Sequence, residues 1–175
     1  MIMPPGLRKV GLTAHIASSV GWLGAVTAFL CLAITAVVSP EVQIVRAMDI
    51  AMAPFGRFVL VPLSIASLLT GIFQSFGTNW GLLRHYWVLA KLLINVLATA
   101  VLLLYMPSIG YLADLAADTT SATTDLHLLR SPSPVLHAGA ALALLIVATV
   151  LGVYKPRGAT PYGQRMQRSP TRALG

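Results

Sequence analysis

Residues 10–38 read VGLTAHIASSVGWLGAVTAFLCLAITAVV, and this stretch decides the fold because it contains no formally charged residue. A helix crosses the roughly 30 Å hydrocarbon layer of a bilayer with about 20 apolar residues, so the stretch predicts a membrane-spanning helix. Arg8 and Lys9 stand just before it, as basic residues do in a signal peptide. The hydrophobic region of a signal peptide is only about 7–15 residues long, and no convincing small-residue cleavage site follows here. We therefore interpret the stretch as a span that the protein retains.

Three further segments have the same character, and together they predict an all-α bundle of four transmembrane helices. The predicted spans are residues 10–38, 58–76, 86–105 and 135–154. Only 10% of the 175 residues are charged, whereas a soluble domain has about 25%. We expect one transmembrane domain over residues 1–155, followed by a basic, disordered tail over residues 156–175.

The basic residues predict the orientation of the bundle. With four spans, both termini and the loop 77–85 lie on one side of the membrane. That side holds eight of the twelve lysines and arginines, and the opposite side holds three. Because cytoplasmic loops carry the excess of Lys and Arg, we expect both termini in the cytoplasm and the protein in the cytoplasmic membrane. All five acids then lie on the outer side.

The composition also narrows the range of partners. The net charge is +7, but the basic residues cluster in short tails and loops without interleaved aromatic residues, which argues against nucleic-acid binding. The single cysteine, Cys31, excludes a disulfide framework and any site that needs several thiolates. We expect the lipid bilayer as the main partner and anionic lipid as a candidate partner of the C-terminal tail. Homo-oligomers and hetero-oligomers both stay open.

Prolines predict helical extensions on the outer side. Ser39 and Pro40 predict a helix start, with Ser39 as the N-cap and Pro40 at the first helical position. Apolar residues at helical spacing continue this helix toward Pro54, where we expect a break or kink before the second span. Pro107 follows the third span, and the sequence SIGYLADLAAD at residues 108–118 predicts helix beyond it.

His15 and Lys91 are ionisable residues inside predicted spans, and they lie at the same depth. His15 is six residues past Lys9, about 9 Å from the inner interface at the helical rise per residue. Lys91 is seven residues past Arg84, about 10 Å deep on the same side. The two residues therefore share a level in the inner half of the bundle.

Polar and small residues at helical spacing extend this level into a candidate pocket. Such stripes face other helices rather than acyl chains, so we predict a polar pocket in the inner half of the bundle. Its candidate members are His15, Ser19, Trp22, Gln74, Lys91 and Asn95.

Both ionisable residues also have a purely structural interpretation. Lys91 can snorkel to the inner interface, because its side chain tilts toward a helix N-terminus on that side. His15 can hydrogen-bond a serine or a carbonyl between helices. Whether the two residues face each other depends on the order of the helices around the bundle, which the sequence leaves open.

A second set of candidate ligands lies on the outer side. Its members are Met48, Met52, Met106, His127 and His137. Thioether and imidazole groups suit copper, which makes copper handling a hypothesis. His137 is eighteen residues above Lys155, about 18 Å from His15 in depth, so these two histidines do not ligate one iron.

Longer motifs resemble known families. SVGWLGA at residues 19–25 and VPLSIASLLTGIFQSFGTNWGLLRHYWVLAKL at residues 61–92 resemble an uncharacterised family of integral membrane proteins, a domain of unknown function, over residues 10–157. The His–WLG opening and the aromatic–Lys–Leu–Leu span are more remotely similar to copper-resistance D membrane domains and to four-helix HemJ-type protoporphyrinogen oxidases. The oxidase resemblance implies haem b, with His15 in the place of a functional first-helix histidine and Lys91 in that of a functional third-helix lysine.

Three functions follow as hypotheses, and no soluble-enzyme motif decides between them. The first is a structural or accessory membrane protein without chemistry of its own. The second is a haem- or porphyrin-binding redox protein, in which His15 ligates the iron and Lys91 pairs with a propionate or transfers a proton. The third is copper handling by the outer methionines and histidines.

Overall fold

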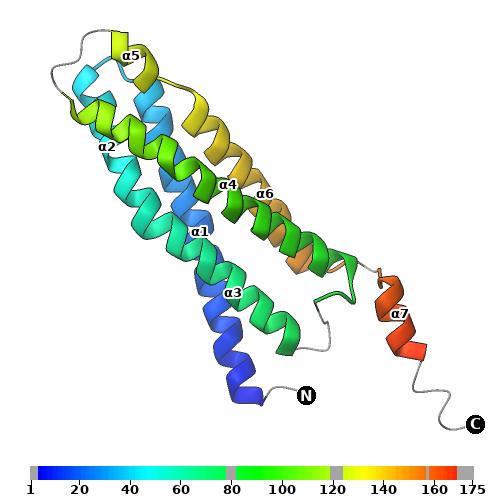
Figure 1. Cartoon of the computed structure of the whole chain (residues 1–175). Helices are drawn as coiled ribbons and strands as arrows, with labels where there is room; N and C mark the ends of the chain where they lie inside the picture. The colour runs from blue at the N-terminus through cyan, green and yellow to red at the C-terminus, as the bar shows by residue number, and fades with distance from the viewer. Residues whose placement is uncertain (1–3, 78–81, 119–123, 157, 169–175) are drawn as a thin grey trace, which may run out of the picture.

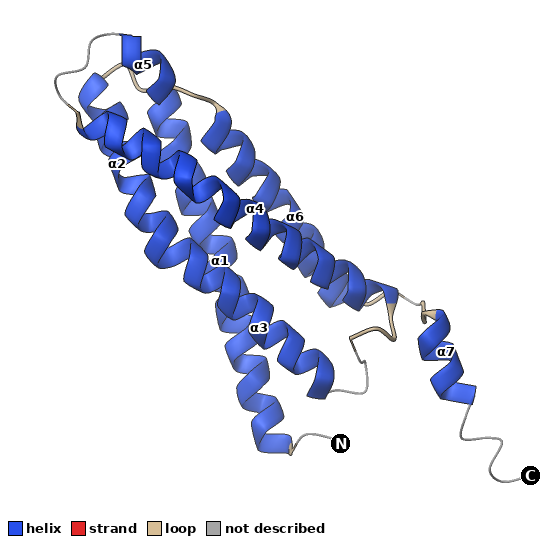
Figure 2. Ribbon diagram, viewed as in Figure 1, coloured by secondary structure: helices blue, strands red, loops and turns tan. Residues whose placement is uncertain are grey.

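The computed structural model describes residues 4–77, 82–118, 124–156 and 158–168. Within these ranges the chain forms helices and no β-strand (Figures 1 and 2). The four longest are α1 (Pro5–Val38), α3 (Val61–Gly77), α4 (Tyr86–Ala117) and α6 (Ser133–Tyr154). The others are α2 (Val42–Phe55), the π-helical η1 (Gly56–Leu60), α5 (Thr124–Leu129) and α7 (Pro161–Arg168).

Four helical segments of the described chain are long and apolar enough to cross a membrane, which confirms the prediction of an all-helical chain with four candidate spans. They are Pro5–Val38, Val42–Phe76, Tyr86–Ala117 and Leu126–Tyr154. The second combines α2, η1 and α3. Helix α1 has 34 residues and is about 50 Å long, well beyond the roughly 30 Å of bilayer hydrocarbon.

The order of the helices around the bundle separates the first and third spans. Helix α1 packs against α3 and α6, and α4 also packs against α3 and α6. Helices α1 and α4 therefore lie diagonally across the bundle (Figure 1).

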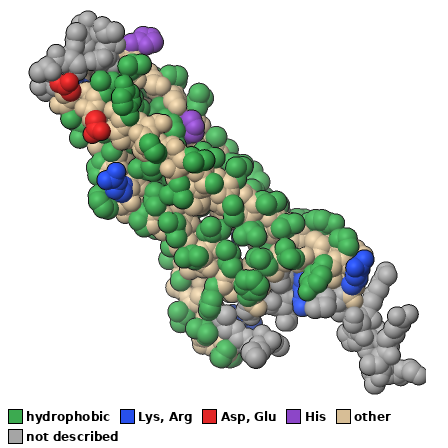
Figure 3. All heavy atoms as spheres, viewed as in Figure 1, with side chains coloured by type: hydrophobic (Ala, Val, Ile, Leu, Met, Phe, Trp, Pro, Cys, Tyr) green, Lys and Arg blue, Asp and Glu red, His purple; other side chains and the backbone are tan. Residues whose placement is uncertain are grey.

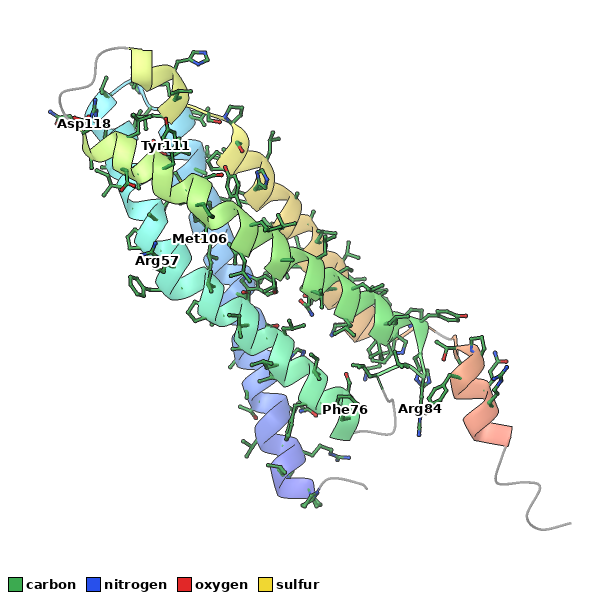
Figure 4. The ribbon with its side chains drawn as sticks, in the orientation of Figure 1. Arg57, Phe76, Arg84, Met106, Tyr111 and Asp118 are labelled. Atoms are coloured by element: carbon green, nitrogen blue, oxygen red, sulfur yellow. The ribbon has the colours of Figure 1, made fainter. Side chains whose placement is uncertain are left out.

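We call the end with α2 and α5 the distal end, and the end with the start of α1 and with α7 the terminal end. Figure 4 places Tyr111 and Asp118 at the distal end, and Phe76 and Arg84 at the terminal end.

Ser39 and Pro40 act differently from the sequence prediction, whereas the helix predicted beyond Pro107 is confirmed, since α4 continues to Ala117. Helix α2 begins at Val42 with Glu41 as its N-cap, and Ser39 Oγ instead accepts the N–H of Glu41 at 3.2 Å. Pro54 lies inside α2, and the chain then widens into the π-helical turn η1 instead of breaking. A proline lacks the N–H that an α-helix needs and crowds the carbonyl four residues earlier, which accounts for the change of helix type. Pro107 lies inside α4 without ending it.

Two arginines hold the distal end together through backbone carbonyls. Arg46 of α2 donates from Nη1 to Ala116 O at 3.1 Å and to Asp118 O at 2.5 Å. The last carbonyls of a helix lack partners in the helix itself, so this arginine caps the C-terminal end of α4. Arg130 donates from Nη2 to Ser39 O at 2.7 Å and so fixes the turn between α1 and α2.

The outside of the bundle is apolar along its length. Leu104, at the middle of α4, is 80% exposed, and Phe58 and Val153 are similarly exposed. On the face in Figure 3, hydrophobic side chains cover the middle of the molecule and the acidic side chains gather toward the distal end. Soluble proteins rarely expose apolar patches of this extent, so the surface is suited to lipid contact.

The segment after α6 contains the short helix α7, which lies within the tail that the sequence predicted over residues 156–175. Thr160 donates from Oγ1 to Leu83 O at 2.6 Å and from its backbone N to Arg84 O at 2.9 Å. Tyr86 N donates to Gly158 O at 3.3 Å. These bonds dock the start of α7 on the segment that precedes α4. This docking depends on residues far apart in the sequence, so the composition of the tail did not indicate it.

The close approach of α7 generates a prediction for Gly163. A Cβ atom at this position would overlap the carbonyl of Arg84, whereas a Cβ at Gly158 would meet only the Tyr86 ring at an ordinary 3.6 Å. We expect Gly163→Ala to detach α7 and to accelerate tryptic cleavage after Arg165 several-fold in the detergent-purified protein. Gly158→Ala is the matched control, and equal cleavage rates for the two variants would contradict the docked position of α7.

Candidate functional site

A polar seam runs between α1 and α3. Its members are His15, Ser18, Ser19, Ser67 and Thr70. His15 Nδ1 lies 3.1 Å from Thr70 Oγ1, and Ser19 Oγ lies 2.8 Å from Ser67 Oγ. The seam realises the prediction that polar stripes in the spans face neighbouring helices rather than acyl chains.

The hydrogen bonds of Thr70 assign the tautomer of His15. Thr70 Oγ1 donates its one hydrogen to Ala66 O at 2.6 Å, so toward His15 it acts as an acceptor. His15 therefore carries its proton on Nδ1, which leaves the lone pair of Nε2 for another partner. Gly71 lies beside the ring, where a Cβ atom would sit 3.1 Å from His15 Cε1. The seam thus holds the imidazole in one place and one orientation.

Lys91 contacts α6, whereas His15 contacts α3. The Nζ of Lys91 packs against Gly152 of α6, where a Cβ atom would lie 2.9 Å from the nitrogen. Asn95, one turn farther along α4, is half-buried.

The remaining predicted pocket residues divide between two places. Gln74 donates from Nε2 to Arg8 O at 3.2 Å, which ties α3 to the start of α1. Ser19 belongs to the polar seam. Trp22 is buried in the apolar core. The structure therefore brings His15, Ser19 and Gln74 to the α1–α3 interface, while Lys91 lies against α6 and Trp22 faces an apolar cavity.

This cavity is a feature of the bundle interior that sequence reasoning missed. It has a volume of about 180 Å³ and lies among α1, η1, α4 and α6. Its walls include three alanines of α6, namely Ala138, Ala140 and Ala141. The other residues that line it are Trp22, Val26, Phe29, Leu60, Leu97, Ala98, Val101, Leu102, Tyr105, Ile109, His137 and Leu144. The small alanines leave space that larger residues at the same positions would fill.

The cavity reaches the lipid-facing surface between α4 and α6. Leu97 and Val101 of α4 line it and are also 55% and 40% exposed. Ala140 of α6 lines it from the other helix and is exposed as well. A molecule dissolved in the bilayer could therefore enter from the side, without crossing either polar face of the membrane.

A hydrogen-bonded group of side chains closes the distal side of the cavity. The rings of Tyr105 and His137 stack, with centroids 4.0 Å apart and planes 10° from parallel. Tyr105 Oη donates to Ser133 Oγ at 2.9 Å, and His137 Nδ1 lies 2.9 Å from Ser133 O and 3.4 Å from its Oγ. At the distal side of the apolar cavity, α4 and α6 are therefore joined by the polar side chains of Tyr105, Ser133 and His137.

Trp22 borders the cavity and carries a buried polar atom that lacks a partner. Its indole ring is buried and lines the cavity, and Nε1 has no acceptor among the described residues. An indole N–H can only donate, and a buried donor without an acceptor costs about 1–3 kcal/mol. A ligand with a hydrogen-bond acceptor would recover part of that cost only if the indole ring turned Nε1 toward the cavity.

The predicted copper ligands lie in different surroundings. Met52 is buried in the apolar core, His127 is exposed, and His137 stacks on Tyr105. Met106 packs against Gly56, close to Arg57 in Figure 4. No group of three or more His, Cys, Asp or Glu side chains in the described part of the chain is placed to hold a metal ion.

Asp49 is a second residue that sequence reasoning passed over. The sequence placed it among the outer acids, but its side chain is only 1% exposed, in the distal core. The signal was present in the spacing, because Asp49 follows Val45 by four residues and precedes Met52 by three, and both of these are buried. An acid on the apolar face of an amphipathic helix is buried by the same packing as its neighbours.

Comparison with known proteins finds no matching family model, no similar curated protein and no similar solved structure. The family resemblances drawn from the sequence motifs therefore stay predictions, and the function is argued from the site alone.

The seam generates a prediction for stability. Thr70→Val removes the acceptor of the His15 Nδ1 proton at nearly constant volume, so we expect the free energy of unfolding in detergent to fall by about 1 kcal/mol. Thr149→Val is the matched control, because Thr149 Oγ1 bonds only Leu145 O of its own helix, at 2.8 Å. Equal losses in the two variants would show that the bond between α1 and α3 contributes nothing.

Proposed function

We propose that the protein is an accessory integral membrane protein that takes a small lipid-soluble molecule into the cavity among α1, α4 and α6. The observation that carries this proposal is an apolar cavity of about 180 Å³ that opens between two lipid-facing helices. An empty apolar cavity of about 150 Å³ stays dry and binds benzene, so this one is large enough for a substituted ring or a short stretch of acyl chain.

The chemistry of the wall narrows the ligand class. The Nε1 of Trp22 and the Tyr105–Ser133–His137 group are the polar features beside an otherwise apolar space. A ligand with an apolar ring would fill the apolar space, and one carbonyl oxygen on that ligand would offer an acceptor to the polar groups beside it. The class is therefore an apolar molecule with a single hydrogen-bond acceptor.

The orientation of the protein belongs to the same proposal. In the sequence, eight of the twelve basic residues come before the first span, between the second and third spans, or after the fourth. This distribution supports a cytoplasmic location for the termini and the cytoplasmic membrane as the compartment. The basic residues near α7 then lie where anionic lipid headgroups are available.

Fluorescence quenching tests the proposed binding. With Trp80 and Trp87 replaced by Phe, Trp22 is the sole tryptophan of the chain. Because Trp22 lines the cavity, para-bromoacetophenone should quench it saturably. Para-bromotoluene, which has no acceptor, should bind about fivefold to tenfold more weakly, in proportion to one neutral hydrogen bond.

A cavity-filling substitution provides the matched control. Ala141→Phe places a ring in the cavity and should abolish saturable quenching, whereas Ala143→Phe lies on the exposed side of α6 and should leave it intact. Equal, unsaturable quenching in all three proteins would mean that the ketone only partitions into the detergent, and the proposed function would be wrong.

A haem or porphyrin at His15 is the second candidate function. The favouring observation is the tautomer of His15, whose Nε2 lone pair suits an axial ligand while Thr70 orients the ring. The surroundings fit less well, because His15 does not line the cavity and a porphyrin is much larger than the benzene-sized space. Lys91 also lies against Gly152 of α6 rather than in the seam.

An optical spectrum of the purified protein, oxidised and then reduced with dithionite, separates the two candidates. The cavity proposal predicts no Soret band, with or without added haem. A Soret band that persists in Thr70→Val and disappears in His15→Ala would replace the cavity proposal by the haem hypothesis.

A further inference from the structure

Arg57 is a charged residue on the apolar outside of the bundle. It belongs to η1, within the candidate span Val42–Phe76, and its exposed side chain has no hydrogen bond or ion pair with any described residue. Arg46 and Arg130, the other basic residues on the distal side, instead donate to backbone carbonyls. A guanidinium that faces hydrocarbon without a counter-charge is costly, so Arg57 needs water or an anion from outside the chain.

A continuous apolar surface begins directly after Arg57. Phe58 is 73% exposed. The other exposed side chains as far as the end of this segment are also apolar, namely Pro62, Ile65, Leu69, Phe73 and Phe76. Phe76 follows Arg57 by 19 residues, which is about 28 Å of helix and close to the roughly 30 Å of bilayer hydrocarbon. Arg57 therefore stands at one edge of this apolar surface, and Figure 4 places Phe76 at the terminal end.

Arg57 lies level with polar-tipped rings on α4 and α6. A Cβ atom at Gly56, the preceding residue, would lie 3.0 Å from Met106 Sδ. Tyr105, next to Met106, stacks on His137 with ring centroids 4.0 Å apart. Tyrosine and histidine have an apolar body and a polar tip, which suits the headgroup level of a membrane.

Helix α6 gives nearly the same distance from this level to the terminal end. Tyr154 follows His137 by 17 residues, which is about 25 Å of helix. Tyr154 is 79% exposed and stands directly before Lys155. The residues of both helices therefore indicate a bilayer that extends from the level of Arg57 to the terminal end.

The exposed face of α4 changes its chemistry at the same level. From Leu93 to Leu104 its exposed side chains are all apolar. Beyond Met106 they include the polar Ser108 and Asp114. The helix continues for 11 residues past Met106, about 16 Å. The distal part of the bundle thus has the surface of a segment outside the hydrocarbon.

We propose that Arg57 binds the phosphate group of a phospholipid in the leaflet at its level, and that the distal part of the bundle stands outside the bilayer. A guanidinium donates two parallel hydrogen bonds to a phosphate, and Phe58 beside it is exposed to the acyl chains. The contact is independent of the proposed cavity ligand, because Arg57 does not line the cavity.

Thiol labelling in nanodiscs tests the level of the bilayer. In a Cys31→Ser background, Tyr111→Cys and Leu93→Cys each introduce the sole cysteine of the chain. The native side chains at these positions are 61% and 60% exposed, so without a bilayer the two thiols would react alike. A water-soluble maleimide should modify Tyr111→Cys at least about tenfold faster, because a thiol among acyl chains does not ionise. Nanodiscs expose both membrane faces to water, so the result does not depend on orientation.

Native mass spectrometry of the detergent-purified full chain tests the headgroup contact. The probe is dioctanoyl phosphatidylglycerol, whose headgroup carries no cation that would compete with Arg57. At a saturating lipid concentration, Arg57→Gln should bind one lipid fewer than the wild type. Arg57→Lys, which keeps the positive charge, should bind the same number as the wild type.

Three results would overturn the proposal. One is equal labelling of Tyr111→Cys and Leu93→Cys, which would remove the bilayer edge between them. Another is an unchanged number of bound lipids in Arg57→Gln. The third is displacement of the lipid by inorganic phosphate at equal concentration, which would make Arg57 a site for free phosphate. The labelling variants keep the native Arg57, so that arm decides the level of the bilayer even where Arg57→Gln fails to fold.

Discussion

Inside a bilayer every polar group must find its partner within the protein, and the rest of this structure depends on that constraint. The backbone meets it by forming helices through all the described spans. Several hydroxyls meet it inside their own helix, as Thr35 does on Cys31 O and Thr149 on Leu145 O. His15 meets it between helices, through Thr70. Among the described residues, few buried side chains have a polar atom without a hydrogen-bond partner, and these include Trp22 and Asp49.

Those exceptions point to the places where the bundle can bind something. Helix α6 packs against both α1 and α4. The cavity exists because α6 has alanines where it faces the larger side chains of these two helices. Trp22 borders that space and has a buried N–H without an acceptor among the described residues. Asp49 is buried in the distal core, and its carboxyl oxygens also have no partner among the described residues. A bundle with no binding role would gain stability by filling the space and by replacing the acid, so both features call for a functional reason.

The sequence predicted the spans well, but it did not predict which helices pack against each other, and both results have one physical reason. Hydropathy and length are local properties, so they predicted an all-helical chain with four spans. Helical periodicity predicted that His15 faces another helix, but it could not say which helix, and Thr70 was not anticipated. The diagonal placement of α1 and α4 and the docking of Thr160 on Leu83 depend on contacts between distant parts of the chain. The cavity beside the alanines of α6 was not anticipated, because a cavity appears only when the opposite walls are in place.

The most direct test of the central claim is xenon-129 NMR of the wild-type protein in nanodiscs, because xenon binds empty apolar cavities of this size. The account predicts a saturable shift of the xenon signal that protein-free nanodiscs do not show, and that para-bromoacetophenone reverses by competition. A xenon signal that depends only on the amount of lipid would contradict it, because the core of the bundle would then contain no space for a ligand.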